Sequence, residues 1–238
     1  MIKETPLHAI TKLKEHVDTD AMVFGRACHL LAQDKVAFAE KYTFAPEGMR
    51  RDPRAKAYQD FLAANNGKTI LSFEDWKTLK GIERSFDAHP LTKHLHGAKI
   101  EHSGFWTDQE TGVLCKIRPD FFIDGVVYDL KTSAKGIDQW SFEKTIHDFG
   151  YHISSAMYLH GLSEILGEKL KRFVIIAVEK SAPFEIVYYD LTDAVIEKGM
   201  EEFRRAILLY AQCESMGVFP GYAKEFTPIG LPAYAWGI

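Results

Sequence analysis

The stretch RPDFFIDGVVYDLKTS, residues 118–133, decides the fold expected for this chain. Its second half, Val126–Thr132, is rich in β-branched residues and predicts a strand. Side chains alternate between the two faces of a strand, so Asp129 and Lys131 project from one face while Leu130 points into the core. An acid and an amine that share a strand face can hold a metal ion and a water molecule at the same place.

A second acid, Asp120, follows Pro119 and stands before this strand, with eight residues between it and Asp129. The intervening Asp124-Gly125 pair is a strong turn signal, and a hairpin through it would bring Asp120 back beside Asp129. Two carboxylates that converge at strand ends favour hard cations. The pattern therefore predicts a Mg²⁺ site, with Mn²⁺ as an alternative ion.

The same residues also have a plainer interpretation. Asp129 and Lys131 could form a solvated strand edge and Asp120 could be a turn residue, because short patterns of this kind are common by chance. A second Asp-x-Lys, Asp75 to Lys77, falls in an expected helix, where residues two apart face different sides. Spacing alone leaves both interpretations open.

The order of the remaining elements predicts an α+β fold with a mixed sheet, rather than a regular parallel β-α repeat. Helices come first, then a run of strands, then helices, two further strands and a long helix. Helices are expected over Asp20–Tyr42, Ala55–Ala64, Phe73–Phe86, Ile137–His147, Tyr151–Leu166 and Thr192–Cys213. Strands are expected over Ala98–Trp106, Val113–Ile117, Val126–Thr132, Phe173–Val178 and Phe184–Tyr189.

No repeat, low-complexity segment or Pro/Gly/Ser-rich linker divides the 238 residues, so a single domain over 1–238 is expected.

Lys plus Arg is 29 and Asp plus Glu is 33, and a net charge of -4 does not draw a protein onto nucleic acid. Basic residues would have to gather locally. The densest cluster is Arg50, Arg51, Arg54 and Lys56, which is either a phosphate-binding track or a solvated loop.

Three scattered cysteines, Cys28, Cys115 and Cys213, form no CxxC motif and predict neither a zinc site nor a disulfide framework. The N-terminus is charged throughout and has no apolar signal core. No apolar run is long enough to cross a bilayer, so no membrane association is expected. These features predict a cytoplasmic protein.

The PD-x₈-DLK segment resembles the core motif of PD-(D/E)xK nucleases. More closely, most of the chain resembles the nuclease domain of exonuclease VIII and its phage relatives. Several motifs occur in the matching order, which makes the resemblance more specific than Asp-x-Lys alone. They are Gly25-x-x-x-His29, Glu101–Trp106, Arg118–Asp120, Asp129–Thr132 and Tyr151–Tyr158.

The resemblance implies a role for each matching residue. Asp120 and Asp129 would ligate the metal together with the backbone carbonyl of Leu130. Lys131 would orient or help deprotonate the attacking water and offset charge on the phosphate. His29 would be a further metal ligand, although a lone histidine at such a spacing is more often a core or surface residue.

Other matching positions predict contacts with metal, water or DNA. Glu101 is a weaker candidate catalytic residue, and Arg118 is a candidate DNA contact. Related nucleases carry a Gln-x-x-x-Tyr helix on the DNA. Tyr158 matches the tyrosine of that motif, whereas Ser154 stands where glutamine is expected, and a hydroxyl can still bond phosphate.

Tyr151 and His152 lie on the same expected helix and are further candidate DNA contacts. For Tyr151, packing in a helical stripe with Tyr158 is an equally open alternative.

By resemblance, we expect a Mg²⁺-dependent exonuclease that degrades linear duplex DNA from its ends in the 5′ to 3′ direction. It would act in phage-type recombination with a single-strand annealing protein. A homo-oligomeric ring is expected, with the aromatic tail Phe219–Trp236 either at an interface or in the core.

The alternatives to an exonuclease are an endonuclease of the same superfamily and a DNA-binding or assembly protein with an inactive nuclease fold. Relatives that carry an iron–sulfur cluster need four cysteines, which three cannot supply.

Overall fold

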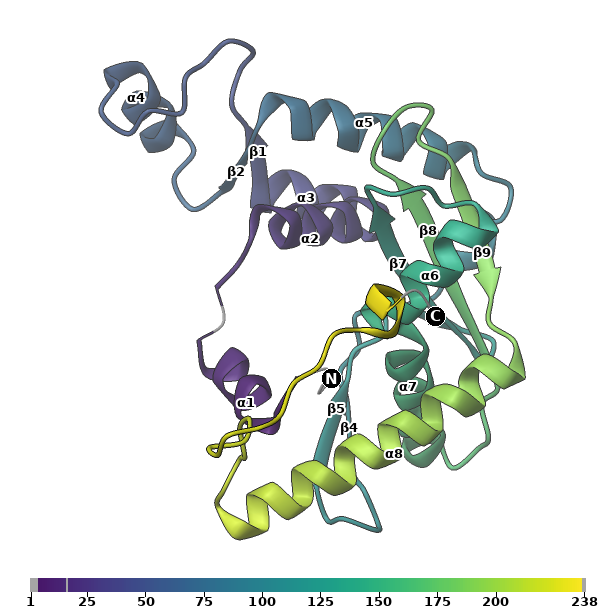
Figure 1. Cartoon of the computed structure of the whole chain (residues 1–238). Coiled ribbons are helices and arrows are strands. Elements are labelled where there is room, and N and C mark those ends of the chain that lie inside the picture. Colours follow the sequence, from purple (N-terminus) through teal and green to yellow (C-terminus); the bar gives the residue numbers. More distant parts are fainter. Residues whose placement is uncertain (1–3, 16, 237–238) are drawn as a thin grey trace. The chain divides into compact units, whose positions relative to one another are not determined.

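The computed structural model describes residues 4–15 and 17–236, and Figure 1 labels most of their elements. The chain forms two compact units. The larger unit contains Asp18–Arg204, and the smaller one joins the residues up to Val17 to those from Arg205 onward. The long helix α8 (Asp193–Met216) begins in the larger unit and ends in the smaller one. The expectation of a single domain stays a prediction.

A five-stranded mixed sheet forms the centre of the larger unit, which confirms the predicted fold class. Its strand order is β3-β6-β7-β8-β9, with β7 and β8 parallel and the other neighbours antiparallel. The bounds are β3 Lys99–Ile100, β6 Phe121–Ile123, β7 Val126–Ser133, β8 Arg172–Glu179 and β9 Ile186–Asp190.

Helices cover both faces of this sheet, because its inner strand β8 is apolar on both sides. Residues 173–178 are buried without interruption. On one face, Leu130 and Ile176 pack into a core with α2 (Asp20–Gln33) and α5 (Phe73–Ala88), which lie side by side in Figure 1. On the other face, Phe173 meets Tyr158 of α7 (Tyr151–Leu166) edge to face, at 6.3 Å between ring centroids.

Two smaller sheets and several helices complete the larger unit. The antiparallel ribbon of β4 and β5 connects the sheet to α7, and β1 pairs with β2 in parallel. The bounds are β1 Tyr42–Phe44, β2 Thr69–Leu71, β4 Gly104–Thr107, β5 Leu114–Ile117, α3 Lys35–Lys41, α4 Lys56–Ala64, η1 Thr92–Leu95 and α6 Gln139–Phe149.

Two elements that were predicted to be continuous are each divided in the structure. The expected helix over Asp20–Tyr42 is two helices, because the carboxylate of Asp34 accepts hydrogen bonds from Val36 N and Ala37 N and so caps a new helix. The expected strand over Ala98–Trp106 is divided at Glu101, whose φ of 53° lies in the left-handed region. The chain leaves the central sheet at that residue and enters the β4–β5 ribbon.

The smaller unit contains α1 (Pro6–Lys14), the end of α8, and the tail with η2 (Ala233–Trp236). Leu7 N donates a hydrogen bond to Pro220 O, which ties the tail to α1. Further along the tail, Phe226 and Ile229 are fully exposed. Core packing is therefore not the role of these two residues. Within the described part of the chain, no helix is both long and apolar enough to cross a membrane.

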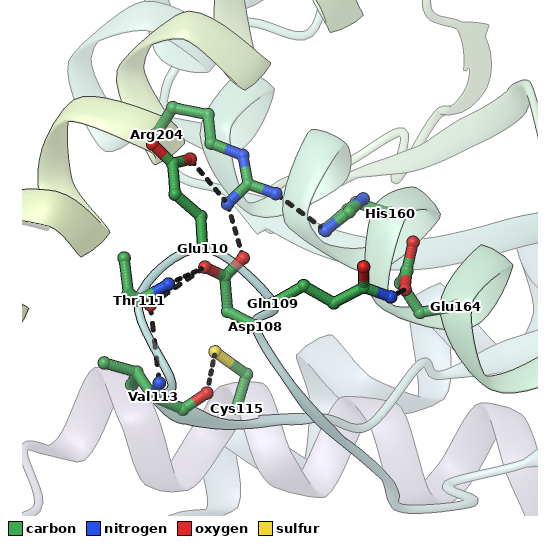
Figure 2. A network of polar contacts seen from close by, with 9 residues as sticks. All are labelled: Asp108, Gln109, Glu110, Thr111, Val113, Cys115, His160, Glu164 and Arg204. Carbon is green, nitrogen blue, oxygen red and sulfur yellow. Dashed lines mark hydrogen bonds and ion pairs between the residues drawn. The ribbon is translucent and has the colours of Figure 1, made fainter.

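A network of polar contacts fixes the turn of the β4–β5 ribbon (Figure 2). The Arg204 guanidinium of α8 donates to Asp108, whose side chain is completely buried. It also lies 3.0 Å from His160 Nε2 of α7. Thr111 donates to the same carboxylate from its backbone N–H and its hydroxyl. Burial alone would raise the pKa of Asp108, but the hydrogen bonds from Arg204 and Thr111 lower it.

Removal of Arg204 should therefore destabilise the larger unit, because the buried Asp108 carboxylate would lose its countercharge. We expect Arg204→Ala to lower the free energy of unfolding by about 3–5 kcal/mol. Arg172→Ala removes an arginine from an exposed pair with Asp190 and should cost less than about 1 kcal/mol. Urea unfolding followed by circular dichroism measures both, and equal losses would contradict the assignment.

Candidate metal centre

The β6–β7 hairpin brings the two acids of the PD-x₈-DLK segment together, as predicted. Asp124 and Gly125 have φ values of 49° and 75°, so the turn adopts the left-handed backbone that its sequence favours. Phe121 pairs with Tyr128, and the next step of this register places Asp120 opposite residue 129. The hairpin therefore defines the position of the buried Asp120 carboxylate.

Backbone and side-chain hydrogen bonds hold this carboxylate from two directions. Asp120 Oδ2 accepts from Leu130 N at 2.7 Å, and Asp120 Oδ1 lies 3.0 Å from His29 Nδ1 of α2. In an extended strand, the N–H and C=O of one residue point to the same edge. The carbonyl of Leu130 therefore faces the Asp120 side of β7.

Glu101 completes a group of three side chains that could hold a metal ion. Within the described residues, ligand atoms of His29, Glu101 and Asp120 lie within 4.8 Å of one another. Gln33 Nε2 donates to Glu101 Oε1 at 3.3 Å and to Asp120 O at 3.4 Å. The left-handed backbone at Glu101 costs conformational energy, and such residues occur often at functional sites.

The electrostatics of His29 and Asp120 are mutually supportive. Burial alone would raise the pKa of Asp120, but the hydrogen bond and charge of His29, with the charge of Lys131, lower it. Burial alone would lower the pKa of His29, but its hydrogen bond to Asp120 raises it. These contacts favour the anionic form of the Asp120 carboxylate, which is the charge state that a cation site needs.

Asp129 and Lys131 share one face of β7, as their strand positions predicted. Lys131 Nζ lies 2.5 Å from Asp129 Oδ2, while the Leu130 side chain is completely buried. Burial alone would lower the pKa of Lys131, but the charges of Asp129 and Asp120 raise it. Asp129 is not among the three residues whose ligand atoms converge, and one of its oxygens is paired with the Lys131 ammonium.

The residues predicted to contact DNA take different places around this centre. Tyr151 is half-buried, and its ring lies under Lys131 Nζ at 5.3 Å. Tyr158 donates to Arg118 O at 3.4 Å, and Ser154, which is exposed, donates to Tyr151 O at 3.0 Å. The Arg118 side chain is exposed and its Nε lies 2.7 Å from Glu101 Oε2.

His152 differs from the expectation, because its side chain lies in the interior. It is 7% exposed, its Nε2 lies 3.4 Å from Glu202 Oε2, and its Nδ1 lies 3.4 Å from Ile146 O. Its neighbour Tyr151 lies about 100° away around the helix and faces Lys131 instead. A side chain that is 7% exposed offers little surface to DNA, and the DNA contact at His152 stays a prediction.

Sequence reasoning missed Gln33, which holds two of the acidic positions in place. A signal was available, because Gln33 follows His29 by one helical turn and shares its face of α2. The basic cluster Arg50, Arg51 and Arg54 lies on an exposed loop, which leaves its role open.

The fold and this group of acids, histidine and lysine are those of a PD-(D/E)xK-type domain. The chain belongs to the family described as "PDDEXK-like domain of unknown function (DUF3799)", whose model matches residues 1–228.

Among solved structures, one from Eubacterium rectale described as a "Putative exonuclease" is 16% identical, with a TM-score of 0.65. That match covers 98% of this chain and 85% of the other, and it shows the shared fold. A second structure, SSO0001, is 14% identical over 84% of this chain and 83% of the other, with a TM-score of 0.32. No curated protein matches the chain.

The donor atoms fit a divalent cation. Two carboxylates and one imidazole supply oxygen and nitrogen ligands, which suit Mn²⁺, and Mg²⁺ accepts carboxylates with several waters. Asp120 and Glu101 come from separate segments, and Leu130 and Gln33 fix their orientation.

Metal binding should depend on Glu101 as well as Asp120. We expect Glu101→Gln and Asp120→Asn each to weaken Mn²⁺ binding by at least about 10-fold, because each removes a charged ligand. Glu110→Gln, on the exposed turn of the neighbouring ribbon, is the matched control and should leave binding unchanged. Titration followed by Mn²⁺ paramagnetic resonance measures all three. Unchanged affinity in both Glu101→Gln and Asp120→Asn would reject the site.

Proposed function

We propose that this protein is a Mg²⁺-dependent exonuclease that hydrolyses phosphodiester bonds from the ends of linear duplex DNA. The observation that supports this most is the convergence of His29, Glu101 and Asp120 beside the Asp129–Lys131 pair. Membership of a PDDEXK-like family supports the nuclease class. The description of the Eubacterium rectale structure and the resemblance to exonuclease VIII support end-directed cleavage.

In the proposed reaction, His29, Glu101 and Asp120 would hold the ion, with Asp129 and the Leu130 carbonyl beside it. A bound divalent cation lowers the pKa of water and offsets charge on a phosphate. The carboxylates contribute the negative charge that retains the ion, and the hydrogen bond from Leu130 N keeps Asp120 in position.

Lys131 acts as a cation in this proposal. The charges of Asp129 and Asp120 raise the pKa of Lys131 and favour its protonated form. The ammonium donates a hydrogen bond and offsets the negative charge that develops on the phosphate. Asp129 fixes the direction of that ammonium through the contact at 2.5 Å.

The proposed biological setting is phage-type recombination in the cytoplasm, with 5′ to 3′ resection and a single-strand annealing protein as partner. A homo-oligomeric ring around the duplex is part of the same proposal. Several apolar residues of the tail are exposed, Phe226, Ile229 and Leu231 among them, and they support an interface there, since exposed apolar side chains that gather on one segment mark contact surfaces.

Digestion of DNA of defined ends tests the activity. A linear duplex should lose nucleotides in Mg²⁺ and remain intact in EDTA, because the carboxylates alone supply no activated water. Labels at the 5′ or the 3′ end reveal the direction of cleavage. Cleavage of closed circular DNA would indicate an endonuclease instead, and no cleavage in Mg²⁺ or Mn²⁺ would indicate an inactive DNA-binding protein.

Substitutions of Asp129 and Lys131 on β7 should lower the cleavage rate without unfolding the protein. We expect Asp129→Asn and Lys131→Ala each to lower the cleavage rate by about 100-fold or more, because each removes a charge that is set against the phosphate or the ion. Asp75→Asn alters the other Asp-x-Lys, which lies on α5 and forms its capping box, and should cleave at the wild-type rate. A wild-type rate in either β7 variant, with thermal melting unchanged, would refute the assignment.

A further inference from the structure

An exposed aromatic side chain, Phe149, is separated from Lys131 by one ring, that of Tyr151, and has no role in the metal centre. Phe149 is the last residue of α6 and is 60% exposed. Its ring stacks on that of Tyr151, with 5.6 Å between the centroids and 19° between the planes. Tyr151 in turn contacts Lys131, whose Nζ lies 5.3 Å from the centroid of the Tyr151 ring.

The left-handed backbone of Gly150, between Phe149 and Tyr151, is compatible with this arrangement. Gly150 has φ 67° and ψ 34°, and it is both the C-cap of α6 and the N-cap of α7. A residue with a Cβ is strained in this left-handed conformation, whereas glycine is not. Two consecutive helices thereby meet at one residue, and the side chains on either side of it stack.

Single exposed aromatic residues are common on protein surfaces and carry no meaning alone. Phe149 differs because it is the last member of a series of contacting side chains. The series begins at Lys131, continues through the Tyr151 ring and ends at the exposed Phe149 ring. Lys131, which faces the phosphate in the proposed reaction, stands at one end of the series, and the accessible ring of Phe149 stands at the other. In a nucleotide, the base lies one sugar away from its phosphate, so a substrate with its phosphate at Lys131 has a base within reach of these rings.

We propose that Phe149 and Tyr151 form a stacking platform for the terminal base of the DNA strand that is cut. This inference rests on the proposed function and names the form of DNA that the site receives, an end whose last base has left the duplex stack. Aromatic rings bind bases of any sequence, because every base has a π face. The platform would thus position the scissile phosphate without selecting a sequence.

Trp140 provides a matched control on the same helix. It is 77% exposed, and it stands nine positions before Phe149 in α6. At about 100° per residue, nine positions place it on roughly the opposite side of the helix. A general effect of losing an exposed aromatic ring from α6 would appear in both variants, whereas a platform effect would appear at Phe149 alone.

The test uses linear duplexes that carry 2-aminopurine, either at the terminal nucleotide or in the middle, titrated with the full chain in Ca²⁺ instead of Mg²⁺, so that a divalent cation offsets the acids of the site while cleavage is slowed. The wild type should change the fluorescence of the terminal probe and leave the internal probe unchanged. Phe149→Ala should abolish that change and weaken binding by about 5- to 100-fold. Phe149→Trp should restore both, and Trp140→Ala should behave as the wild type.

The possible outcomes separate this inference from the proposed function. Wild-type fluorescence and affinity in Phe149→Ala, or equal losses in Phe149→Ala and Trp140→Ala, would overturn the platform. Either result, together with Mg²⁺-dependent cleavage by the wild type, would leave the exonuclease proposal standing. A terminal-probe signal that depends on Phe149 in a protein that cleaves no DNA would support the platform and reject the exonuclease. Unchanged thermal melting of Phe149→Ala excludes misfolding as the cause of any loss.

Discussion

The hydrogen bond from Leu130 N to Asp120 Oδ2 is the contact on which the candidate site depends. It joins the two ends of the β6–β7 hairpin at the point where the regular strand pairing stops. The same carboxylate meets His29 through its other oxygen, so one buried anion connects the sheet to α2. A buried carboxylate without such partners would be protonated, and its affinity for a cation would be lost.

Two ion pairs lie at opposite ends of the β4–β5 ribbon. The pair of Asp108 and Arg204 fixes the far turn of the β4–β5 ribbon, while Glu101 and Arg118 form a pair at the near end of it. The ribbon carries Glu101 just before it and Asp120 just after it. Its rigidity therefore bears directly on the distance between two acids of the metal centre.

The overall charge of the protein says little about its proposed substrate. A net charge of -4 repels DNA at long range, and the acids of the site add to that effect until a cation is bound. Attraction would then come from the bound ion, from Lys131 and Arg118, and from stacking at Phe149. Stacking is insensitive to net charge, which makes an aromatic platform a fitting device for an acidic protein.

The sequence by itself determined the α+β class, the β6–β7 hairpin and the shared face of Asp129 and Lys131, because alternation and turn chemistry are local properties of the chain. Only the tertiary structure decided that Glu101 converges with His29 and Asp120, that His152 lies in the interior, and that the Tyr151 ring lies between Phe149 and Lys131. Each of these depends on how separate elements pack, and side-chain packing across elements leaves no periodic trace in the sequence.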